Sequence, residues 1–588
     1  MREDMNYRTS LCGDISESWI GKEIVLSGWI DRIREVGAIT FILLRDHSGI
    51  IQLVADSSHM DCSVVKNLNH EFVIHVSGLV RARNAEVINL EMKTGRLEVI
   101  LSSFTVISKC NPLPFEIQKS FEVDENLRMK YRYLDLRNPH MTQNIQMRHH
   151  IMQTTRNFFS KQGFIEVETP YMGKSTPEGA RDFLVPSRIL AGSFYALTQS
   201  PQLFKQLLMI GGIDKYFQIC RCFRDEDFRL DRQPEFSQID FEMAFTTEDE
   251  IRSCIESLMS EIYKNVSGIE LTVPFPKLSY QDAINQYGSD KPDLRFGMPM
   301  QNLTDIFNKP EYKNFYEAIQ SGSVVFGLKA EGKDFQMSRK ESDDFIQTLG
   351  LKDEALYLIR HKEDGISANF MTPEDKQKLL DTFNSQIHDM FFVVLGKNRK
   401  TQIALGNVRN KLGAKLLAKK SENYPAFLWV HDFPLFTWNE EESRYDSEHH
   451  PFTEPRMDDF AKWIDTDPLK IGSCAFDLVL NGFELGSGGL RIHDPVLQKK
   501  IFQMIGVSEN LIEDQFGFLL EALSFGAPPE GGFAIGLDRV AMLMTGSPSL
   551  RDVIAFPKNT KGASPLTGEP VPATDKQLDI LHIQTKQI

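Results

Sequence analysis

Apolar and polar positions alternate along the first part of the chain, in short runs that turn-forming residues separate. These runs predict strands over residues 23–30, 39–45, 50–55, 72–80 and 97–103. Five strands at this spacing are typical of a small β-barrel of the OB kind, which we place at residues 1–110. Residues 111–140 carry prolines and mix charge with apolar side chains, so we interpret them as a hinge.

From residue 148 the hydrophobic pattern becomes helical, and Gly163 stands where a left-handed cap would end the helix. A strand is predicted over residues 164–167. Strand-rich, aromatic sequence returns after Pro425. We therefore predict one catalytic domain in two parts, residues 141–299 and 423–560, followed by an extension at 561–588.

Between the two predicted catalytic parts lies a mixed run of strands and charged helices that carries no catalytic motif. It includes predicted strands over residues 323–328 and 356–359 and a Lys-rich helix near 411–420. We interpret residues 300–422 as an inserted α/β domain. The resulting fold class is α+β and multidomain.

Composition and charge argue against several classes of protein, including membrane-spanning, secreted, zinc-motif and disulfide-rich proteins. The chain has 588 residues, enough for several hydrophobic cores, and no run approaches the ~18 apolar residues of a membrane span. Its start lacks the pattern of a signal peptide, so we expect a cytoplasmic protein with no membrane partner. Seven cysteines, with one residue between the only close pair, offer neither a zinc motif nor a disulfide framework. The net charge of −15 means that any contact with RNA must be local.

A predicted hairpin carries an unusual concentration of polar side chains. Its strands span residues 216–224 and 237–245, and the charged loop between them is longer than the ~2–5 residues of a tight hairpin. Period-2 geometry gives each strand one polar face. The first strand carries Gln218, Cys220, Cys222 and Arg224 on one face, and the second carries Gln238, Asp240 and Glu242. The ordinary alternative is a hairpin whose polar face is simply solvated. The long loop, which contains Arg229 and Arg232, favours a hairpin that belongs to a functional site.

The segment FRDEDFRLDRQPEF at residues 223–236 resembles motif 2 of the class II aminoacyl-tRNA synthetases, in the form found in their bacterial aspartyl branch of subclass b. The resemblance implies that Arg224 contacts the α-phosphate of ATP and the carboxylate of the amino acid. A rigid guanidinium fork suits this role, because negative charge grows on the phosphate oxygens during attack.

Residues 531–546 (GGFAIGLDRVAMLMTG) are similar to motif 3, a strand that runs into a helix at Gly536. The four residues GLDR alone can occur by chance. The match to motif 3 becomes specific because the same chain also matches motif 2 around Arg224. The resemblance implies that Arg539 and Phe236 enclose the adenine as a cation–π sandwich. The implied ATP-binding set is Arg224, Asp225, Glu226, Gln233, Phe236, Glu484, Gly536, Leu537, Asp538 and Arg539.

Two acidic residues, Glu484 and Asp477, are candidate ligands for Mg²⁺, which prefers hard oxygen ligands and the phosphates of ATP. The alternative is that both are ordinary surface acids. Three glycines near Glu484, at positions 486, 488 and 489, are expected to let substrate approach the backbone. Arg224, Arg539 and Glu484 form the predicted catalytic set.

The choice of amino acid is predicted by charges, because a buried carboxylate needs fixed cations and a buried ammonium needs acids. By resemblance, Lys205 and Arg491 hold the side-chain carboxylate of aspartate. The residues implied around the rest of the amino acid are Glu178, Gln202, Asp240, His449 and Arg224. Glu178 lies in STPEGARDF, which resembles the family's loop that closes over the substrate. Each residue taken alone has an ordinary structural alternative.

The first domain resembles the family's anticodon-binding OB fold, in which aromatic residues stack on splayed bases. Candidate contacts are Trp29, Arg32, Arg34, Phe41, Gln52 and Arg83, although Trp29 is equally compatible with a core position. Val36 and Glu86 lie in loops that bear on whether tRNA-Asn is charged beside tRNA-Asp. The sequence leaves that choice open.

The resemblance implies an OB barrel joined to a six-stranded antiparallel sheet flanked by helices. It implies ATP-dependent ligation of L-aspartate to tRNA-Asp through an aspartyl-adenylate. The helix from residue 148 resembles motif 1, a homodimer seam, although Phe158 and Phe159 are equally compatible with an internal core. Two alternatives stay open: a nucleic-acid-binding protein acting through its OB fold, and a paralogue that activates aspartate for another acceptor.

Overall fold

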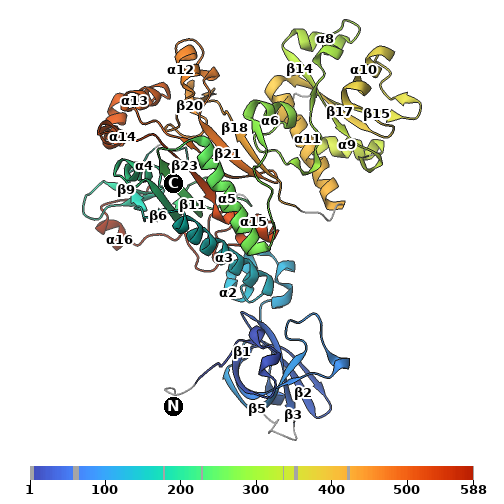
Figure 1. The fold of residues 1–588 in the computed structure, drawn as a ribbon, viewed down its shortest axis with the longest axis vertical. Helices are drawn as coiled ribbons and strands as arrows, with labels where there is room; N and C mark the ends of the chain where they lie inside the picture. The colour runs from blue at the N-terminus through green and yellow to red at the C-terminus, as the bar shows by residue number, and fades with distance from the viewer. Residues whose placement is uncertain are drawn as a thin grey trace. The chain divides into compact units, whose positions relative to one another are not determined.

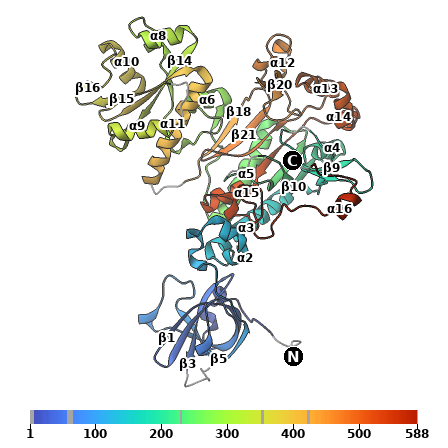
Figure 2. The ribbon, with the colours of Figure 1, turned by 180° about the vertical axis from the view of Figure 1, so that it is seen from behind.

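The computed structural model describes residues 6–56, 65–176, 179–226, 230–335, 337–349, 355–419 and 424–586. The chain forms two compact units. The first comprises residues 1–147, 228–230 and 547–572, and the second comprises residues 148–227, 231–546 and 573–588. Figures 1 and 2 show the fold from opposite sides. No helix in the described ranges combines the length and apolar character that crossing a membrane requires.

The first unit begins with a closed five-stranded barrel in the order β1-β2-β3-β5-β4. Its strands are β1 Glu23–Val36, β2 Ile39–Asp46, β3 Gly49–Asp56, β4 Val73–Ala82 and β5 Leu97–Ser108. All five predicted strands are confirmed. Strand β1 continues past its predicted end at residue 30, because the charged residues that follow stay paired with β2 in the register Arg34↔Phe41.

The segment predicted as a hinge contains helices, η5 Ile117–Glu122, α1 Glu125–Lys130 and α2 Arg132–Asp135. The reason lies in its mixed charges, which form buried ion pairs within the first unit. Arg128 and Arg132 contact Asp135 at 3.2 and 2.6 Å, and Arg128 contacts Asp552 at 3.2 Å. The mixed charges of this segment therefore belong to a packed, helical structure.

Helix α3, Pro139–Lys161, begins before the predicted start at residue 148, with a proline at its first position. Near its end, Phe159 stacks on Phe217 with ring centroids 4.9 Å apart, and Phe158 is also buried. Both phenylalanines thus serve an internal core. Gly163 follows with φ +79°, as predicted for a left-handed cap.

The second unit is built on an eight-stranded sheet in the order β12-β18-β21-β22-β23-β11-β10-β6. The six central strands are antiparallel, as predicted, and one parallel strand is added at each edge. The strands are β6 Ile165–Glu166, β10 Lys215–Phe223, β11 Glu235–Ala244, β12 Lys277–Ser279, β18 Phe427–His431, β21 Ala475–Leu480, β22 Phe483–Leu490 and β23 Glu530–Gly536.

Helices and small sheets surround this sheet. Helix α5 runs along it in both ribbon views. The helices are α4 Gln202–Ile210, α5 Glu248–Ser267, α6 Tyr280–Tyr287, α12 Met457–Trp463, α13 Pro495–Met504, α14 Glu509–Ser524, α15 Leu537–Thr545 and α16 Asp575–Ile580. Short strands form two further sheets: β7 Met172–Gly173, β8 Leu184–Pro186 and β9 Phe194–Leu197; β19 Phe436–Asn439 and β20 Arg444–Ser447.

The glycines of β22 have a packing role that differs from the predicted one. A Cβ added at Gly486 or Gly488 would lie 2.2 Å from a backbone oxygen of β23. These positions are therefore small because the neighbouring strand and the Phe533 ring lie against them. Room for substrate is not the reason.

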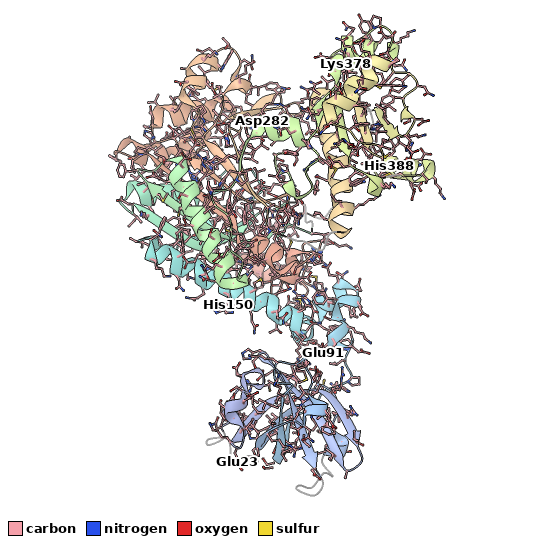
Figure 3. All side chains as sticks on the ribbon, turned by 45° about the vertical axis from the view of Figure 1, so that its right-hand side comes forward. Glu23, Glu91, His150, Asp282, Lys378 and His388 are labelled. Carbon is pink, nitrogen blue, oxygen red and sulfur yellow. The ribbon has the colours of Figure 1, made fainter. Side chains whose placement is uncertain are left out.

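The inserted residues form a five-stranded sheet in the order β13-β14-β17-β15-β16, covered on both faces (Figure 3). Its strands are β13 Gln301–Asn302, β14 Ser323–Ala330, β15 Ala355–Lys362, β16 Gly365–Ile366 and β17 Met390–Lys397. Helices α7 Thr304–Phe307, α8 Lys313–Gln320 and α10 Pro373–Phe383 share a core with one face, and α9 Arg339–Gln347 and α11 Asn398–Lys419 share a core with the other. The predicted strands β14 and β15 and the predicted Lys-rich helix are confirmed.

Candidate active site

The polar face of the predicted hairpin exists, and the register of β10 and β11 shows how it forms. Gln218 pairs with Asp240 and Cys220 pairs with Gln238, so these side chains share one face. Strand β11 also pairs with β23, which in turn pairs with β22. Residues from four strands far apart in sequence therefore line one region of the sheet.

A buried network of charges occupies this region. Lys205, on α4, lies 2.8 Å from the Asp240 carboxylate and 2.9 Å from the Glu242 carboxylate. Arg491 donates to Glu242 through Nε at 2.7 Å and through Nη2 at 3.3 Å. None of these four side chains is more than 2% exposed. Two cations thus lie against two carboxylates in a space from which water is excluded.

The pKa values in the network follow from burial and pairing. Burial raises the pKa of Asp240, and although Lys205 opposes this, the value reaches about 6. Burial also acts to raise the pKa of Glu242, but Arg491 and Lys205 outweigh it and hold the pKa below its usual value. Burial acts to lower the pKa of Lys205, but Asp240 and Glu242 keep it raised. Lys205 therefore stays charged at neutral pH.

Two adjacent histidines extend the network in different ways. His449 Nε2 lies 3.0 Å from Asp477 Oδ1, and this carboxylate raises the pKa of His449 although burial opposes it. His450 Nε2 lies 2.9 Å from Arg491 Nη1. Burial and Arg491 together put the pKa of His450 well below its usual value, so its neutral ring accepts from the guanidinium.

Arg224 follows the end of β10 directly and is partly buried. Its guanidinium carbon lies 5.2 Å from the centroid of the Phe236 ring. Its Nε–H is buried and has no hydrogen-bond partner among the described residues. The structure thus brings Arg224 onto Phe236, which was predicted to pack against adenine. Asp225, Glu226 and Gln233 are in the same loop, where Glu226 contacts Arg232 at 2.6 Å and Gln233 is buried.

The strand-to-helix junction predicted at Gly536 is present, with Gly536 at the N-cap of α15. Arg539, in the first turn, donates to the carbonyl of Glu484 and lies 3.5 Å from the Asp231 carboxylate. Its Nε is also buried without a partner in the described ranges. Leu537 is fully buried. Asp538 pairs with Arg148 and accepts from the Ser237 amide at 2.9 Å, which is a structural role.

The two candidate metal ligands have partners of their own. Glu484 Oε2 lies 3.3 Å from Lys291 Nζ, and the Glu484 side chain is 35% exposed. Asp477 is buried and holds His449. In the described ranges, no group of three His, Cys, Asp or Glu side chains is arranged to hold a metal ion.

Several buried polar atoms in this region have no partner among the described residues: Gln202 Nε2, Gln206 Nε2 and Oε1, Gln218 Nε2, Asp240 Oδ1 and His449 Nδ1. Buried polar atoms are normally hydrogen-bonded, so this concentration is typical of a site that receives a polar ligand. Glu178 and Arg229 lie outside the described residues.

The predicted RNA contacts differ in exposure. Arg32 and Arg34 are exposed on β1, and Phe41 pairs across from Arg34. Gln52 donates to Glu98 at 2.8 Å. Arg83 is 8% exposed and donates to the Leu97 carbonyl at 3.0 Å, as expected of a structural side chain.

Trp29 is half-buried, and the Arg137 guanidinium covers its ring at 5.1 Å. Val36, at the end of β1, is 47% exposed, and Glu86 is also exposed. The two positions predicted to bear on the choice of tRNA therefore lie on the surface.

Sequence reasoning assigned no role to Glu242, His450 or Lys291. For Glu242 a signal existed, because it shares the period-2 polar face with Asp240. For Lys291, which contacts the Glu484 carboxylate across the fold, no local pattern pointed to a role.

Comparison with known families agrees with this geometry. Residues 124–560 match the model described as tRNA synthetases class II (D, K and N). Residues 24–107 match the model of the OB-fold nucleic acid binding domain. Together the two matches cover the barrel and the sheet that holds the charged network.

Curated relatives match along nearly the whole chain. One named Aspartate--tRNA ligase, from Macrococcus caseolyticus, is 46% identical over 99% of both chains. One named Aspartate--tRNA(Asp/Asn) ligase, from Aquifex aeolicus, is 45% identical over 98% of both chains.

Solved structures share the fold at low sequence identity. The asparaginyl-tRNA synthetase from Pyrococcus horikoshii, complexed with asparaginyl-adenylate, superposes with a TM-score of 0.59 at 18% identity, covering 94% of this chain and 98% of that one. The aspartyl tRNA synthetase from Entamoeba histolytica gives 0.56 at 19% identity, covering 95% and 94%.

Proposed function

The chain belongs to the class II tRNA synthetases for aspartate, lysine and asparagine, and from that premise we propose that it ligates L-aspartate to tRNA using ATP. The observation that carries the choice of amino acid is the buried pair of cations, Lys205 and Arg491. Lysine would bring a third cation next to this pair, and asparagine would offer the two cations, which already contact Asp240 and Glu242, a neutral amide in place of a further carboxylate. Aspartate is the member of the group whose side chain complements the site.

The residues divide the chemistry between them. The α-carboxylate of aspartate attacks the α-phosphorus of ATP, forming aspartyl-adenylate and releasing pyrophosphate. Arg224 stabilises the charge that grows on the α-phosphate, while Arg539 and Phe236 hold the nucleotide. Asp240, with its pKa of about 6, is a carboxylate at neutral pH and receives the substrate ammonium. The terminal ribose hydroxyl of tRNA then attacks the acyl carbon, and AMP leaves.

Mg²⁺ is the proposed cofactor, and Glu484 fits its requirements better than Asp477. Glu484 is partly exposed and, among the described residues, its carboxylate contacts Lys291 at 3.3 Å, whereas Asp477 is buried against His449. When bound with the phosphates of ATP, the ion would neutralise part of their charge.

Exchange of pyrophosphate into ATP tests the choice of amino acid. We expect exchange that depends on L-aspartate. For lysine or asparagine, kcat/KM should be lower than for aspartate by a factor on the order of 10² or more, because neither a cation nor a neutral amide makes the charge-assisted hydrogen bonds of a carboxylate to Lys205 and Arg491. Exchange driven equally well by lysine or asparagine would contradict the assignment of the pocket.

The tRNA partners follow from the OB domain. We propose tRNA-Asp as a substrate, and tRNA-Asn as a second one, because relatives of both kinds match over the whole chain at similar identity. The matched OB domain also disfavours a paralogue that transfers aspartate to another acceptor. A protein that acts only through this domain would not need the buried charged network.

Charge changes at Val36 and Glu86 should alter which tRNA is charged. For Val36→Asp and Glu86→Lys we expect the ratio of tRNA-Asp to tRNA-Asn charging to shift about tenfold, the effect of losing or gaining a base contact. Aspartate-dependent exchange should stay at the wild-type value, because it needs no RNA. Loss of exchange in either variant would contradict the separation of the two functions.

We also propose a cytoplasmic homodimer, because the part of α3 from residue 148 resembles motif 1, the homodimer seam. Phe158 and Phe159 are internal, so support for a seam rests on the exposed positions of this helix, such as His149 and His150. Sedimentation of the purified chain at micromolar concentration tests this proposal, and a monomer would contradict it.

A further inference from the structure

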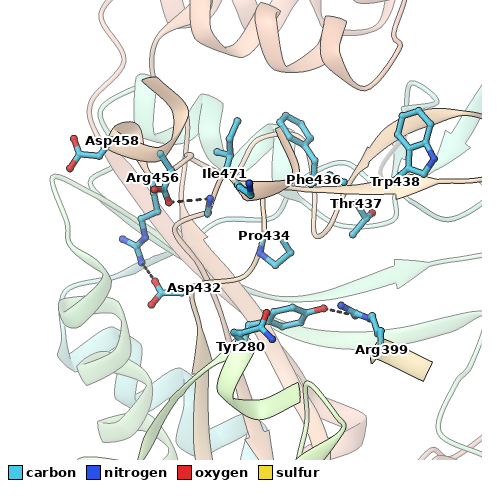
Figure 4. Close-up of a pocket in the computed structure, with 15 residues that line it drawn as sticks. Tyr280, Arg399, Asp432, Pro434, Phe436, Thr437, Trp438, Arg456, Asp458 and Ile471 are labelled. Atoms are coloured by element: carbon cyan, nitrogen blue, oxygen red, sulfur yellow. Dashed lines mark hydrogen bonds and ion pairs between the residues drawn. The ribbon is translucent and has the colours of Figure 1, made fainter. Parts of the chain in front are cut away.

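A pocket outside the charged network lies in the second unit, with a volume of about 950 Å³. We name it the Trp438 pocket. Its wall combines aromatic, cationic and acidic side chains from α6, the start of α11, β19 and the segments around α12: Tyr280, Arg399, Asp432, Trp438, Arg456 and Asp458. In the view of Figure 4, Arg399 and Trp438 lie toward one end, and Arg456 and Asp432 lie toward the other.

The cations of the pocket differ in how far they are neutralised. Arg456 forms ion pairs with Glu248 at 2.6 Å and Asp432 at 2.9 Å. Arg399 donates to the Tyr280 hydroxyl and lies 5.5 Å from that ring, but pairs with no carboxylate in the described ranges. Its guanidinium is thus a candidate to receive an anion.

Positive charge at the start of α11 adds to the attraction for an anion at Arg399. Lys397 and Lys400 flank Arg399 and are exposed. The sequence of α11 contains no Asp or Glu, although the whole chain has a net charge of −15. Cations normally stabilise the other end of a helix, where the macrodipole is negative. This local concentration of positive charge therefore costs stability, and a negatively charged partner would offset it.

One aromatic ring, Phe433, contacts both the wall of the pocket and the candidate active site. The Phe433 ring lies 4.9 Å from the Tyr280 ring and 4.6 Å from the His449 ring. A chain that delivers its end to the aspartate site would therefore pass close to the pocket.

The chemistry of the wall favours a nucleic acid strand over an acidic peptide. Trp438 is 47% exposed, so part of its ring is free to stack on a base. Arg399 and the adjacent lysines suit phosphates. The carboxylate of Asp458 can accept a hydrogen bond from the exocyclic amino group of a base such as cytosine, a donor that acidic side chains lack.

We propose that the Trp438 pocket binds the single-stranded 3′ end of the tRNA substrate while its terminal ribose reaches the aspartate site. The inference rests on the proposed function and extends it to a second contact surface for RNA. Arg399 holds the phosphate backbone there, and Trp438 stacks on a base.

The test uses the full chain with Arg399→Gln and Trp438→Ala as separate variants. Equilibrium binding is measured with a full-length tRNA transcript and with the same transcript trimmed of its single-stranded 3′ end. Each variant should bind full-length tRNA about tenfold more weakly than wild type, and the trimmed RNA equally well. For Arg399→Gln, the salt dependence of binding should lose about 0.7 from its logarithmic slope, the value of one phosphate contact on a single strand.

Lys378→Gln is the matched control, because Lys378 is half-exposed on α10, on the opposite face of the inserted sheet (Figure 3). It should change neither RNA affinity nor exchange. Aspartate-dependent exchange by the two pocket variants should equal wild type, which also reports that they are folded. Trp438→Phe serves if the alanine variant does not fold, and it should retain most of the affinity.

Unchanged affinity of the Arg399 variant for full-length tRNA would overturn the proposal, as would equal weakening with the trimmed RNA. Absence of aspartate-dependent exchange in the wild-type chain would instead contradict the proposed function. The two failures are therefore distinguishable.

Discussion

Arg224→Ala is expected to lower aspartate-dependent ATP–pyrophosphate exchange by a factor on the order of 10³, because it removes a preorganised donor to the charge that develops on the α-phosphate. Arg224 also lies against Phe236, so the variant loses a neighbour of the proposed adenine site. The measurement is the rate of exchange at saturating aspartate and ATP. Thermal unfolding should change little, since the Arg224 side chain is only partly buried.

Arg221 provides a matched control on the same strand. Its side chain projects from the opposite face of β10, where it contacts Glu235 at 2.8 Å, and it is partly exposed. Arg221→Ala should keep most of the exchange activity. Near-normal exchange by Arg224→Ala, or an equal loss in both variants, would show that the hairpin does not hold the phosphate.

Lys205→Met is expected to destabilise the chain and to abolish selective use of aspartate. The change leaves Asp240 with no cation in direct contact and Glu242 with Arg491 alone, and breaking such a buried pair costs about 3–5 kcal/mol. The free energy of unfolding at pH 8 is the first measurement, and KM for aspartate in exchange is the second. Lys264→Met, which removes an exposed lysine of α5, should leave both near wild type.

The pH dependence of that destabilisation gives a sharper test. The folded-state pKa of Asp240 is already raised to about 6, and loss of Lys205 should raise it further. A raised carboxyl pKa means that the native state binds the proton more tightly, so stability falls as pH rises from the unfolded value near 4 through the folded value. The difference between wild type and Lys205→Met should therefore be larger at pH 8 than at pH 5.5. Adding Asp240→Asn should recover part of the loss at pH 8, and a loss independent of pH would contradict the pairing.

Local patterns predicted the parts of this protein in which neighbours along the chain carry the signal. The barrel strands and the polar face of β10 and β11 follow from period-2 alternation, which holds whether or not the partner strand is known. Residues that meet although they are far apart in the chain, such as Lys291 and Glu484, have no such pattern. Their contact depends on the tertiary fold.

Mixed charge did not reveal which side chains are buried. Residues 111–140 were interpreted as a hinge, and within them Arg128, Arg132 and Asp135 are buried in ion pairs. Composition does not distinguish a solvated charge from a paired one, because pairing requires partners that the fold supplies.

By itself, the sequence determined the OB barrel, the antiparallel sheet of the class II fold and the polar faces of β10 and β11, because periodicity and motif resemblance are properties of contiguous segments. Only the tertiary structure decided that Glu242 links Lys205 to Arg491, that Gly486 and Gly488 make room for β23, and that Arg399 and Trp438 line one pocket. Those facts depend on distances between residues far apart in the chain, and such distances exist only once the sheet has formed.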